Sequence, residues 1–362
     1  MRIKAAVLRG HDAPFRIEEV ELSDPGSGEV RVRIAGAGIC HTDVLPRVPG
    51  YPARLPIILG HEGSGVVEEV GPHVTGLQEG DHVVLSYDSC RRCDTCLAGH
   101  PAYCDTFFPR NLTGGGVEGT SPVRDGGAEP IAARWFGQSS FATHALVAAR
   151  NVVKVGEDLP LSLLGPLGCG IQTGAGTVLH ALGVAAGSSL IVFGTGAVGL
   201  SAVMAARVAG ASTIVAVDVN PVRLELAREL GATHAFDGAD DGLPARLREV
   251  TGGAHHTIDT TGLPAVIATA VTALRPTGTC GLVGAPQGDV VLDARTLMAG
   301  RNVRGICEGD AVPHLLVPAL LRLWQQGRFP FDRLIRTFPL DRVNEAERAA
   351  AAGEVVKPVL VP

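Results

Sequence analysis

Four of the eight cysteines crowd into one short stretch, "CRRCDTCLAGHPAYC", at residues 90–104. The spacing C-x2-C-x2-C-x7-C suits four thiolates folded around one tetrahedral zinc ion, with turns at Gly99 and Pro101. Four unrelated cysteines packed this closely would be an oxidation liability, which weakens that alternative. Because protein ligands would fill every coordination position, this zinc leaves no place for a substrate and is structural. The expected ligands are Cys90, Cys93, Cys96 and Cys104.

A second stretch predicts dinucleotide binding. Residues 188–218, "SSLIVFGTGAVGLSAVMAARVAGASTIVAVD", read as strand, glycine turn, helix, strand and a final acidic residue. Gly194 permits the tight turn, Gly196 lets the backbone approach a pyrophosphate, and Gly199 lets the helix pack on the strand. The pyrophosphate would then lie at the helix N-terminus, where free N–H groups and the helix dipole favour anions.

The acidic residue at the end of the second strand, Asp218, indicates which dinucleotide binds. Its carboxylate can accept hydrogen bonds from the adenosine ribose hydroxyls and would repel a 2′-phosphate. The next residues, Val219 and Asn220, offer no cation to offset that repulsion, so NAD is favoured over NADP. Arg223 either reaches the ribose or phosphate or is a solvated helix residue, and the sequence does not separate these alternatives.

The elements around these motifs predict an α/β protein of two domains, since 362 residues exceed one compact core. About six strands alternate with helices over residues 171–307, which predicts a doubly wound parallel sheet. One of its helices is expected to begin with Asn220 as N-cap and Pro221, and to end at Gly231. Residues 1–170 read as mostly β. We expect 308–362, with an amphipathic helix in "HLLVPALLRLWQQGRF", to complete that domain.

Composition excludes several classes of protein. No apolar run approaches the length of a membrane helix, and "MRIKAAVLRGHDAPF" shows no secretory cleavage pattern, so we expect a mature cytoplasmic protein. A net charge of −6 without a block of basic residues argues against a nucleic-acid partner. The four-cysteine lobe leaves a zinc-ribbon nucleic-acid module as a remote alternative, but the net charge and the single Arg91–Arg92 pair argue against it.

Three dispersed residues could hold a reactive metal: Cys40 in "GAGICHTDV", His61 in "LGHEGSGVVEEVG" and Cys169 in "LGCGIQTGAG". Two thiolates, one imidazole and one open position form the ligand set of a catalytic zinc acting on an alcohol. Singly, each has an ordinary explanation as a small buried residue. In this order, with the four-cysteine lobe and the glycine turn, they resemble the medium-chain, zinc-dependent alcohol dehydrogenases over essentially the whole chain.

Within that family the chain looks most similar to the aryl-alcohol (benzyl-alcohol type) dehydrogenases. The stretches behind this are "CHTD" at Cys40, "FGQSSFATHALV" from Phe136, and "EGDAVPHLLVPALLRLWQQGRFPFDRLI" from Glu308. The resemblance implies a GroES-like catalytic domain, a Rossmann domain binding NAD, two zinc ions per chain, and a homodimer or homotetramer. Its expected activity interconverts a small primary alcohol, aromatic or allylic, and its aldehyde.

The resemblance also implies roles for individual residues. Thr42 would accept the alcohol proton, Asp43 would orient His61, and Glu62 would be a carboxylate beside the metal. Thr42 and Asp43 would equally suit a helix start. The cofactor contacts expected besides the glycine turn are His41, Thr173, Val198, Asp218, Arg223, Val283 and Lys357.

The chain departs from many relatives at two positions. Leu45 stands where a histidine often passes the proton to solvent, so the relay must end elsewhere. Ser86 stands where several relatives carry a bulky aromatic residue; it either widens the alcohol pocket or merely ends a strand. The segment Phe107 to Arg134, rich in Gly and Pro, is expected to be a mobile loop near that pocket.

Two relatives of the same fold are alternatives. A thiol-dependent formaldehyde dehydrogenase shares every motif and would require glutathione or mycothiol. A zinc-free quinone reductase is disfavoured by the three dispersed metal ligands. Cys280 and Cys307 are expected on strands of the parallel sheet, away from both metal sites, and to be dispensable.

Overall fold

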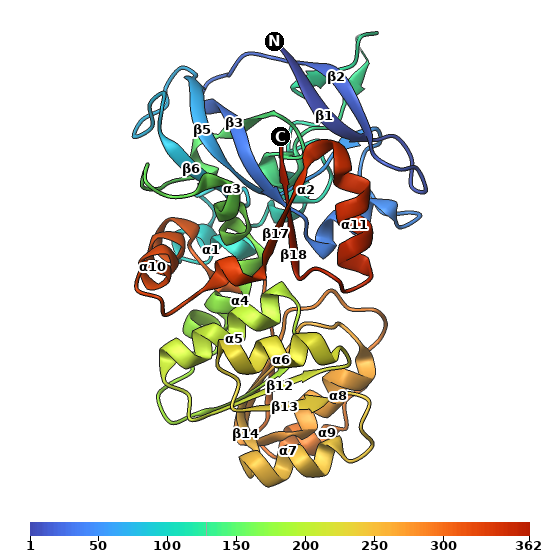
Figure 1. The fold of residues 1–362 in the computed structure, drawn as a ribbon, viewed down its shortest axis with the longest axis vertical. Coiled ribbons are helices and arrows are strands. Elements are labelled where there is room, and N and C mark those ends of the chain that lie inside the picture. The colour runs from blue at the N-terminus through green and yellow to red at the C-terminus, as the bar shows by residue number, and fades with distance from the viewer. Residues whose placement is uncertain (128) are drawn as a thin grey trace. The chain divides into compact units, whose positions relative to one another are not determined.

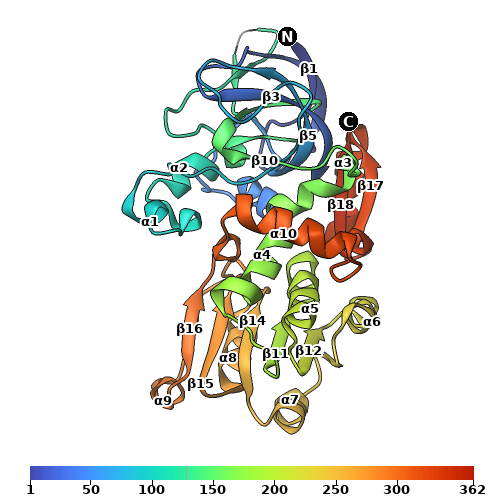
Figure 2. The same ribbon diagram turned by 90° about the vertical axis from the view of Figure 1, so that its left-hand side faces the viewer.

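The computed structural model of the protein describes residues 1–127 and 129–362. The chain divides into two compact units, each with its own sheets (Figures 1 and 2). The first unit contains Met1–Cys169, Val312–Pro318 and Asp332–Pro362, and the second contains Gly170–Ala311 and Ala319–Phe331. The second unit therefore takes in a segment beyond the expected boundary at residue 308.

The first unit is built mostly from strands, in two sheets. One has the strand order β4-β1-β2-β7-β8, and the other has the order β10-β6-β5-β3-β18-β17, with β9 also paired to β3. Their bounds are β1 Arg2–Leu8, β2 Arg16–Leu22, β3 Glu29–Gly38, β4 Ile57–Ile58, β5 Glu62–Val70, β6 His82–Leu85, β7 Val123–Arg124, β8 Pro130–Ile131, β9 His144–Ala148, β10 Val152–Lys154, β17 Ile335–Pro339 and β18 Lys357–Val361. The C-terminal strand β18 pairs antiparallel with β3, so the last residues of the chain join a sheet that is built mainly from N-terminal strands (Figure 1).

Alternation of side chains along β3 explains how this sheet makes a core. Val30, Val32 and Ile34 are buried while the arginines between them are more exposed, as expected for a strand with one face toward the interior. At the end of the strand, Gly38 lies against Glu62 at the start of β5. A Cβ atom at Gly38 would collide with the Glu62 carboxylate, so glycine here makes room for that side chain.

Short helices connect these strands. They are η1 His41–Arg47, α1 Asp94–Leu97, η2 Pro101–Tyr103, α2 Phe107–Asn111, η3 Trp135–Gly137, η4 Ala149–Asn151, α3 Leu161–Leu164, η5 Gly165–Gly168, η8 Phe331–Leu334, η9 Leu340–Arg342 and α11 Val343–Ala351. The segment from Phe107 to Arg134 contains α2, β7 and β8, and β7 pairs with β2; its expected mobility stays a prediction. The composition of a Gly- and Pro-rich segment does not predict that its residues pair with a strand far away in the sequence. Ala128 of that segment lies outside the described residues.

The second unit contains the predicted parallel sheet of six strands. Its order is β13-β12-β11-β14-β15-β16, and all neighbours are parallel, which confirms the doubly wound topology. The strand order reverses between β11 and β14, the place where such sheets bind dinucleotides. The bounds are β11 Ser189–Phe193, β12 Thr213–Asp218, β13 His234–Asp237, β14 Ala254–Asp259, β15 Leu274–Leu282 and β16 Asn302–Gly305.

Helices cover this sheet (Figure 2). The helices that pack against its strands are α5 Ala197–Ala209, α6 Pro221–Leu230, α7 Leu243–Thr251 and α8 Pro264–Thr272. This part of the chain also forms α4 Gly170–Gly176, η6 Thr177–Ala181, α9 Ala294–Met298 and η7 Glu308–Asp310, and the expected amphipathic helix is α10 Pro313–Gln325. Asn220 caps α6 by accepting from the N–H groups of Val222 and Arg223, and Gly231 ends it, as predicted. Across the described residues, no helix is both long enough and apolar enough to cross a bilayer.

The two remaining cysteines differ in position. Cys280 lies buried on β15, as predicted. Cys307 does not lie on a strand, because β16 ends at Gly305 and Cys307 instead precedes η7. An apolar run alone does not show where sheet pairing stops, and this prediction was wrong by that margin.

Candidate metal and nucleotide sites

Three stretches far apart in the sequence meet in the first unit. Cys40 precedes η1, His61 and Glu62 lie at the start of β5, and Cys169 follows η5. One potential ligand atom from each of these four residues lies within 4.8 Å of all the others. The structure therefore brings together the predicted ligands of the reactive metal.

The imidazole of His61 provides a test of whether a metal fits there. The ring is buried, and its Nδ1 is 2.8 Å from Oδ1 of Asp43, while Nε2 has no hydrogen-bond partner among the described residues. A carboxylate can only accept, so Nδ1 carries the proton and Nε2 presents a lone pair. A buried lone pair beside two cysteines is costly unless something binds it, and zinc suits this donor set.

The thiols support the same interpretation. A hydrogen bond with the side chain of Cys169 lowers the pKa of Cys40 well below that of an ordinary thiol, although burial acts in the opposite direction. The thiolate is the form that binds a metal. For His61, burial disfavours the charged ring, but the Asp43 carboxylate raises the pKa above its ordinary value. In the neutral ring that binds a metal, the hydrogen bond to Asp43 places the single proton on Nδ1.

Asp43 holds more than the imidazole. Its Oδ2 accepts from the backbone N–H of Cys40 at 3.0 Å, and its Oδ1 accepts from Gly60 N at 3.2 Å and from the indole Nε1–H of Trp135 at 2.9 Å. One carboxylate thus joins the two ligand-bearing segments. The sequence predicted the contact with His61 but missed Trp135, because nothing local links positions so far apart.

The fourth residue of the cluster, Glu62, forms a buried ion pair with Lys357. The Lys357 ammonium lies 2.8 Å and 2.9 Å from the two carboxylate oxygens and 3.0 Å from the carbonyl oxygen of Ile39. Burial disfavours the Lys357 charge, but Glu62 outweighs it and raises the pKa. The structure places Lys357 on Glu62, and its expected contact with the cofactor stays a prediction.

The other predicted residues of this region lie around η1 and β6. The hydroxyl of Thr42 is 3.8 Å from the sulfur of Cys40, His41 is exposed, and Leu45 is half-buried. Ser86, directly after β6, is buried and donates a hydrogen bond of 2.6 Å to the carbonyl oxygen of Gly168. Ser86 therefore ties down the turn before Cys169, and any effect on pocket width stays a prediction.

The four-cysteine stretch folds into a second cluster. The sulfurs of Cys90, Cys93, Cys96 and Cys104 all lie within 4.8 Å of one another, around the short helix α1. Backbone N–H groups of Arg92 and Cys93 point at the Cys90 sulfur, at 3.5 Å and 3.2 Å, and lower the pKa of Cys90 to about 6. Burial raises the pKa of Cys96 to about 12. Four sulfurs at this spacing fit one tetrahedral zinc.

A serine at Cys93 is expected to lower thermal stability. A structural zinc contributes folding free energy directly, so losing one of its four ligands should lower the free energy of unfolding by several kcal/mol. Each kcal/mol lost should lower the Tm by about 2–4 °C. Thermal unfolding followed by circular dichroism measures this, with Leu97→Ser as control because Leu97 is exposed on the same helix. A Cys93 variant as stable as the parent would contradict the structural assignment.

In the second unit, the glycine turn adopts the conformations that its motif requires. Gly194 has φ +88°, a left-handed conformation that favours glycine. A Cβ at Gly199 would collide with the carbonyl oxygen of Gly194, so helix α5 can approach strand β11 only without one. A Cβ at Gly196 would point into open space, which leaves backbone accessible to a phosphate.

Asp218 lies at the end of β12, held toward this turn. Its Oδ2 accepts from the backbone N–H and hydroxyl of Thr195 at 2.6 Å and 2.7 Å, and its Oδ1 accepts from Asn220 N at 2.9 Å. A cavity of about 270 Å³ lies beside it, lined mainly by apolar side chains. The lining residues are Phe193, Gly194, Val217, Asp218, Val219, Gly238, Leu243, Thr261, Leu263, Ala265, Val266 and Thr269. A mainly apolar cavity with a carboxylate in its lining suits the adenosine of a dinucleotide.

The remaining predicted cofactor residues also belong to the second unit. Val198 is the second residue of α5, and Val283 directly follows β15. Thr173 on α4 is buried, with its hydroxyl 3.4 Å from a carboxylate oxygen of Glu308. The Nε of Arg223 is buried and has no hydrogen-bond partner among the described residues, and the contact of this arginine with a nucleotide stays a prediction.

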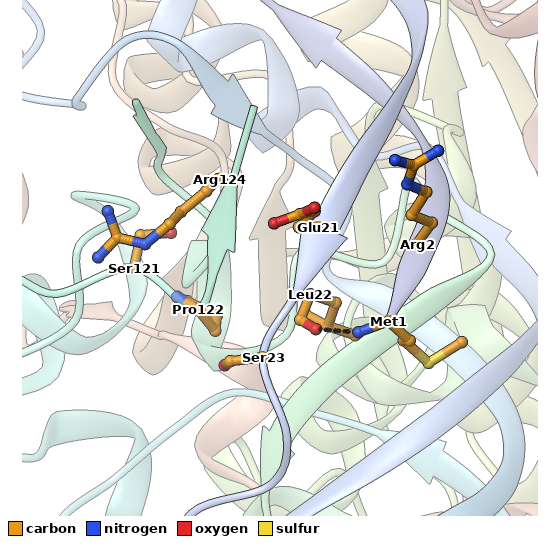
Figure 3. A pocket seen from close by; sticks show the side chains of 8 residues that line it. All are labelled: Met1, Arg2, Glu21, Leu22, Ser23, Ser121, Pro122 and Arg124. Carbon is orange, nitrogen blue, oxygen red and sulfur yellow. Dashed lines mark hydrogen bonds between the residues drawn. The ribbon is translucent and has the colours of Figure 1, made fainter. Parts of the chain in front are cut away.

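A further cavity, of about 500 Å³, lies at the N-terminus and contains none of the predicted site residues (Figure 3). It is lined by Met1, Arg2, Glu21, Leu22, Ser23, Ser121, Pro122 and Arg124. The terminal ammonium donates to the carbonyl oxygen of Leu22 at 2.7 Å. The lining offers no cysteine or histidine and no nucleophile with an adjacent base, so we assign it no chemistry.

Comparison with known proteins identifies the family. A model described as "Alcohol dehydrogenase GroES-like domain" matches residues 26–157, and one described as "Zinc-binding dehydrogenase" matches residues 197–325. The chain is 49% identical to the geraniol dehydrogenase of Castellaniella defragrans, over 99% of this chain and 97% of that protein.

Solved structures agree. The benzyl alcohol dehydrogenase of Acinetobacter calcoaceticus superposes with a TM-score of 0.96 at 44% identity, covering 100% of this chain and 99% of that one. A zinc-binding alcohol dehydrogenase domain protein from Burkholderia ambifaria gives 0.98 at 49% identity, with 100% and 99% covered. These matches confirm the expected GroES-like and Rossmann-type domains. The chain belongs to the zinc-dependent medium-chain alcohol dehydrogenases.

Proposed function

We propose that this alcohol dehydrogenase acts on primary alcohols whose carbinol carbon adjoins a ring or a double bond, with NAD as its cofactor. The observation that carries the proposal is the cluster of the half-buried Cys40 with the buried His61 and Cys169, in which Nε2 of His61 has no hydrogen-bond partner among the described residues. Geraniol is an allylic alcohol and benzyl alcohol an aromatic one. The relatives named for them are 49% and 44% identical to this chain.

The catalytic zinc would be held by Cys40, His61 and Cys169. When bound, it supplies a Lewis acid that lowers the pKa of an alcohol, and NAD supplies the hydride acceptor. Asp43 keeps the His61 proton on Nδ1 and so leaves Nε2 for the metal. Thr42, whose hydroxyl is 3.8 Å from the Cys40 sulfur, would take the alcohol proton. Leu45 cannot carry that proton further.

Glu62 gives the cluster a carboxylate that Lys357 restrains. Two contacts of 2.8 Å and 2.9 Å hold it on the ammonium, and the Cβ-free Gly38 accommodates it. We propose that this pairing keeps Glu62 from competing with substrate for the metal while leaving its negative charge nearby.

A substrate panel tests the proposal. Benzyl alcohol, cinnamyl alcohol and geraniol should give a much higher kcat/KM with NAD than ethanol does. Assays with formaldehyde plus glutathione or mycothiol form the contrasting arm. Turnover that required a thiol, or that was confined to saturated alcohols, would contradict the proposed substrate class.

The same proposal predicts two zinc ions per chain. Seven ligand side chains lie in two separate clusters, one holding four cysteines and one holding Cys40, His61 and Cys169. Elemental analysis of active protein should give about two zinc per chain, and Cys93→Ser and Cys169→Ser should each lose about one. Fully active protein with one zinc or fewer would contradict this. The homodimer or homotetramer remains a prediction for mass measurement in solution.

A further inference from the structure

The segment after β8 contains a strained, buried dipeptide, Trp135–Phe136. Both rings are buried, and Phe136 has φ 49° and ψ 33°. A non-glycine residue in the left-handed region costs about 1–3 kcal/mol and persists only where surrounding contacts enforce it. Each of these two side chains makes a contact that bears on the imidazole of His61.

Trp135 reaches the imidazole through Asp43. Its indole N–H donates to Oδ1 of Asp43 at 2.9 Å, the same oxygen that faces Nδ1 of His61 at 2.8 Å. The main chain that carries the indole is also held, since the Trp135 backbone N–H donates to the Ser139 hydroxyl at 2.9 Å, and that hydroxyl donates to the Ile58 carbonyl at 2.7 Å. Asp43 therefore receives a rigid donor that limits its rotation.

Phe136 acts on the imidazole directly. Its ring stacks on His61 with centroids 4.3 Å apart and planes 22° apart. Behind it, Phe107 meets the Phe136 ring edge-on at 6.3 Å and Trp135 meets it at 5.6 Å. A flat ring backed in this way blocks rotation of the imidazole about its side-chain bonds.

The main chain of His61 is fixed by the same segment. The Gln138 side-chain amide donates to the carbonyl oxygen of His61 at 2.9 Å and accepts from Gly63 N at 3.0 Å. Residues 135–138 thus hold both the backbone and the ring of one metal ligand. A hydrogen bond, a stacking contact and a backbone clamp from one short segment exceed what packing alone requires.

We propose that Trp135 and Phe136 are positioning residues that set the orientation of His61 and thereby the affinity and geometry of the reactive metal site. The inference rests on the proposed function, because it assumes that His61 binds that metal. Outer partners of metal-binding histidines commonly change metal affinity by about 10- to 100-fold.

The test replaces zinc in the reactive site with Co²⁺ and compares Trp135→Phe with the parent. The change replaces the indole with a smaller aromatic ring that has no N–H donor. Chelator competition should show Co²⁺ bound about tenfold more weakly, and the visible absorption bands of the cobalt site should shift. kcat should fall while the KM for NAD stays unchanged. Trp324→Phe on α10 is the matched control and should alter none of these.

Two further variants decide the interpretation. Phe136→Leu keeps an apolar side chain and should also weaken Co²⁺ binding; if Trp135→Phe fails to fold, this measurement carries the test. In an Asp43→Asn background, Trp135→Phe should add little, because its effect passes through that carboxylate. Parent-like affinity and spectrum in both single variants would overturn the inference. A parent protein that binds no Co²⁺ at Cys40, His61 and Cys169 would instead overturn the proposed function.

Discussion

Replacing Cys169 with serine is expected to abolish turnover and leave a folded protein that still binds NAD. Cys169 supplies one of two thiolates in the reactive cluster, and a serine hydroxyl is a poor ligand for zinc at neutral pH. Zinc-assisted activation contributes several kcal/mol of transition-state stabilisation, so kcat should fall by about 10³-fold or more. NAD should still bind, since the glycine turn and the adenosine cavity belong to other residues.

Steady-state assays, calorimetric titration with NAD and zinc analysis together measure this. Cys280→Ser is the matched control: it makes the same chemical change at a buried strand residue outside both clusters and should keep activity and both zinc ions. Near-normal turnover in the Cys169 variant would show that the reactive metal is held by other groups. Loss of NAD binding together with activity would indicate misfolding, and the control shows whether a Cys→Ser change alone can cause it.

Replacing Asp218 with serine or glycine is expected to erode a strong preference for NAD. Hydrogen bonds from Thr195 and Asn220 hold its carboxylate in the lining of the 270 Å³ cavity, where a 2′-phosphate on a bound adenosine would meet its negative charge. One charged hydrogen bond gained with NAD and one repulsion avoided amount to about 2–4 kcal/mol. The parent should therefore favour NAD by tens- to several-hundred-fold in kcat/KM.

The measurement is kcat/KM for both cofactors in parent and variant. Asp237→Ser provides the control, because Asp237 pairs in register with Asp218 on the neighbouring strand β13 but does not line the cavity. That variant should keep the parent's preference. A parent that already used NADP as well as NAD would show that Arg223 or another cation dominates.

Local sequence was sufficient for the parts of the molecule that are themselves local. The glycine turn needs only the residues from β11 to Asp218, because each glycine has a steric task within that unit. The helix α6 could be bounded by Asn220 and Gly231 for the same reason, since capping involves neighbours in sequence. The four-cysteine lobe folds within fifteen positions, so its spacing alone indicated one ion.

The dispersed cluster was predictable in a different way. No spacing rule links Cys40, His61 and Cys169, and only the resemblance to a family joined them before the structure brought their ligand atoms within 4.8 Å. Where no such pattern exists, the sequence left the conformation open. Within the segment Phe107 to Arg134, strand β7 depends on pairing with β2, which the composition of the segment does not encode.

The sequence by itself determined the four-cysteine metal site and the dinucleotide-binding turn, because thiolate spacing and glycine sterics act between residues that are close in sequence. Only the tertiary structure decided what holds those donors. Trp135 reaches Asp43 across 92 positions of sequence, and Lys357 reaches Glu62 across 295. Such contacts form when strands pair and cores close, so they depend on the whole fold. That is why the partners that orient His61 and restrain Glu62 became visible only there.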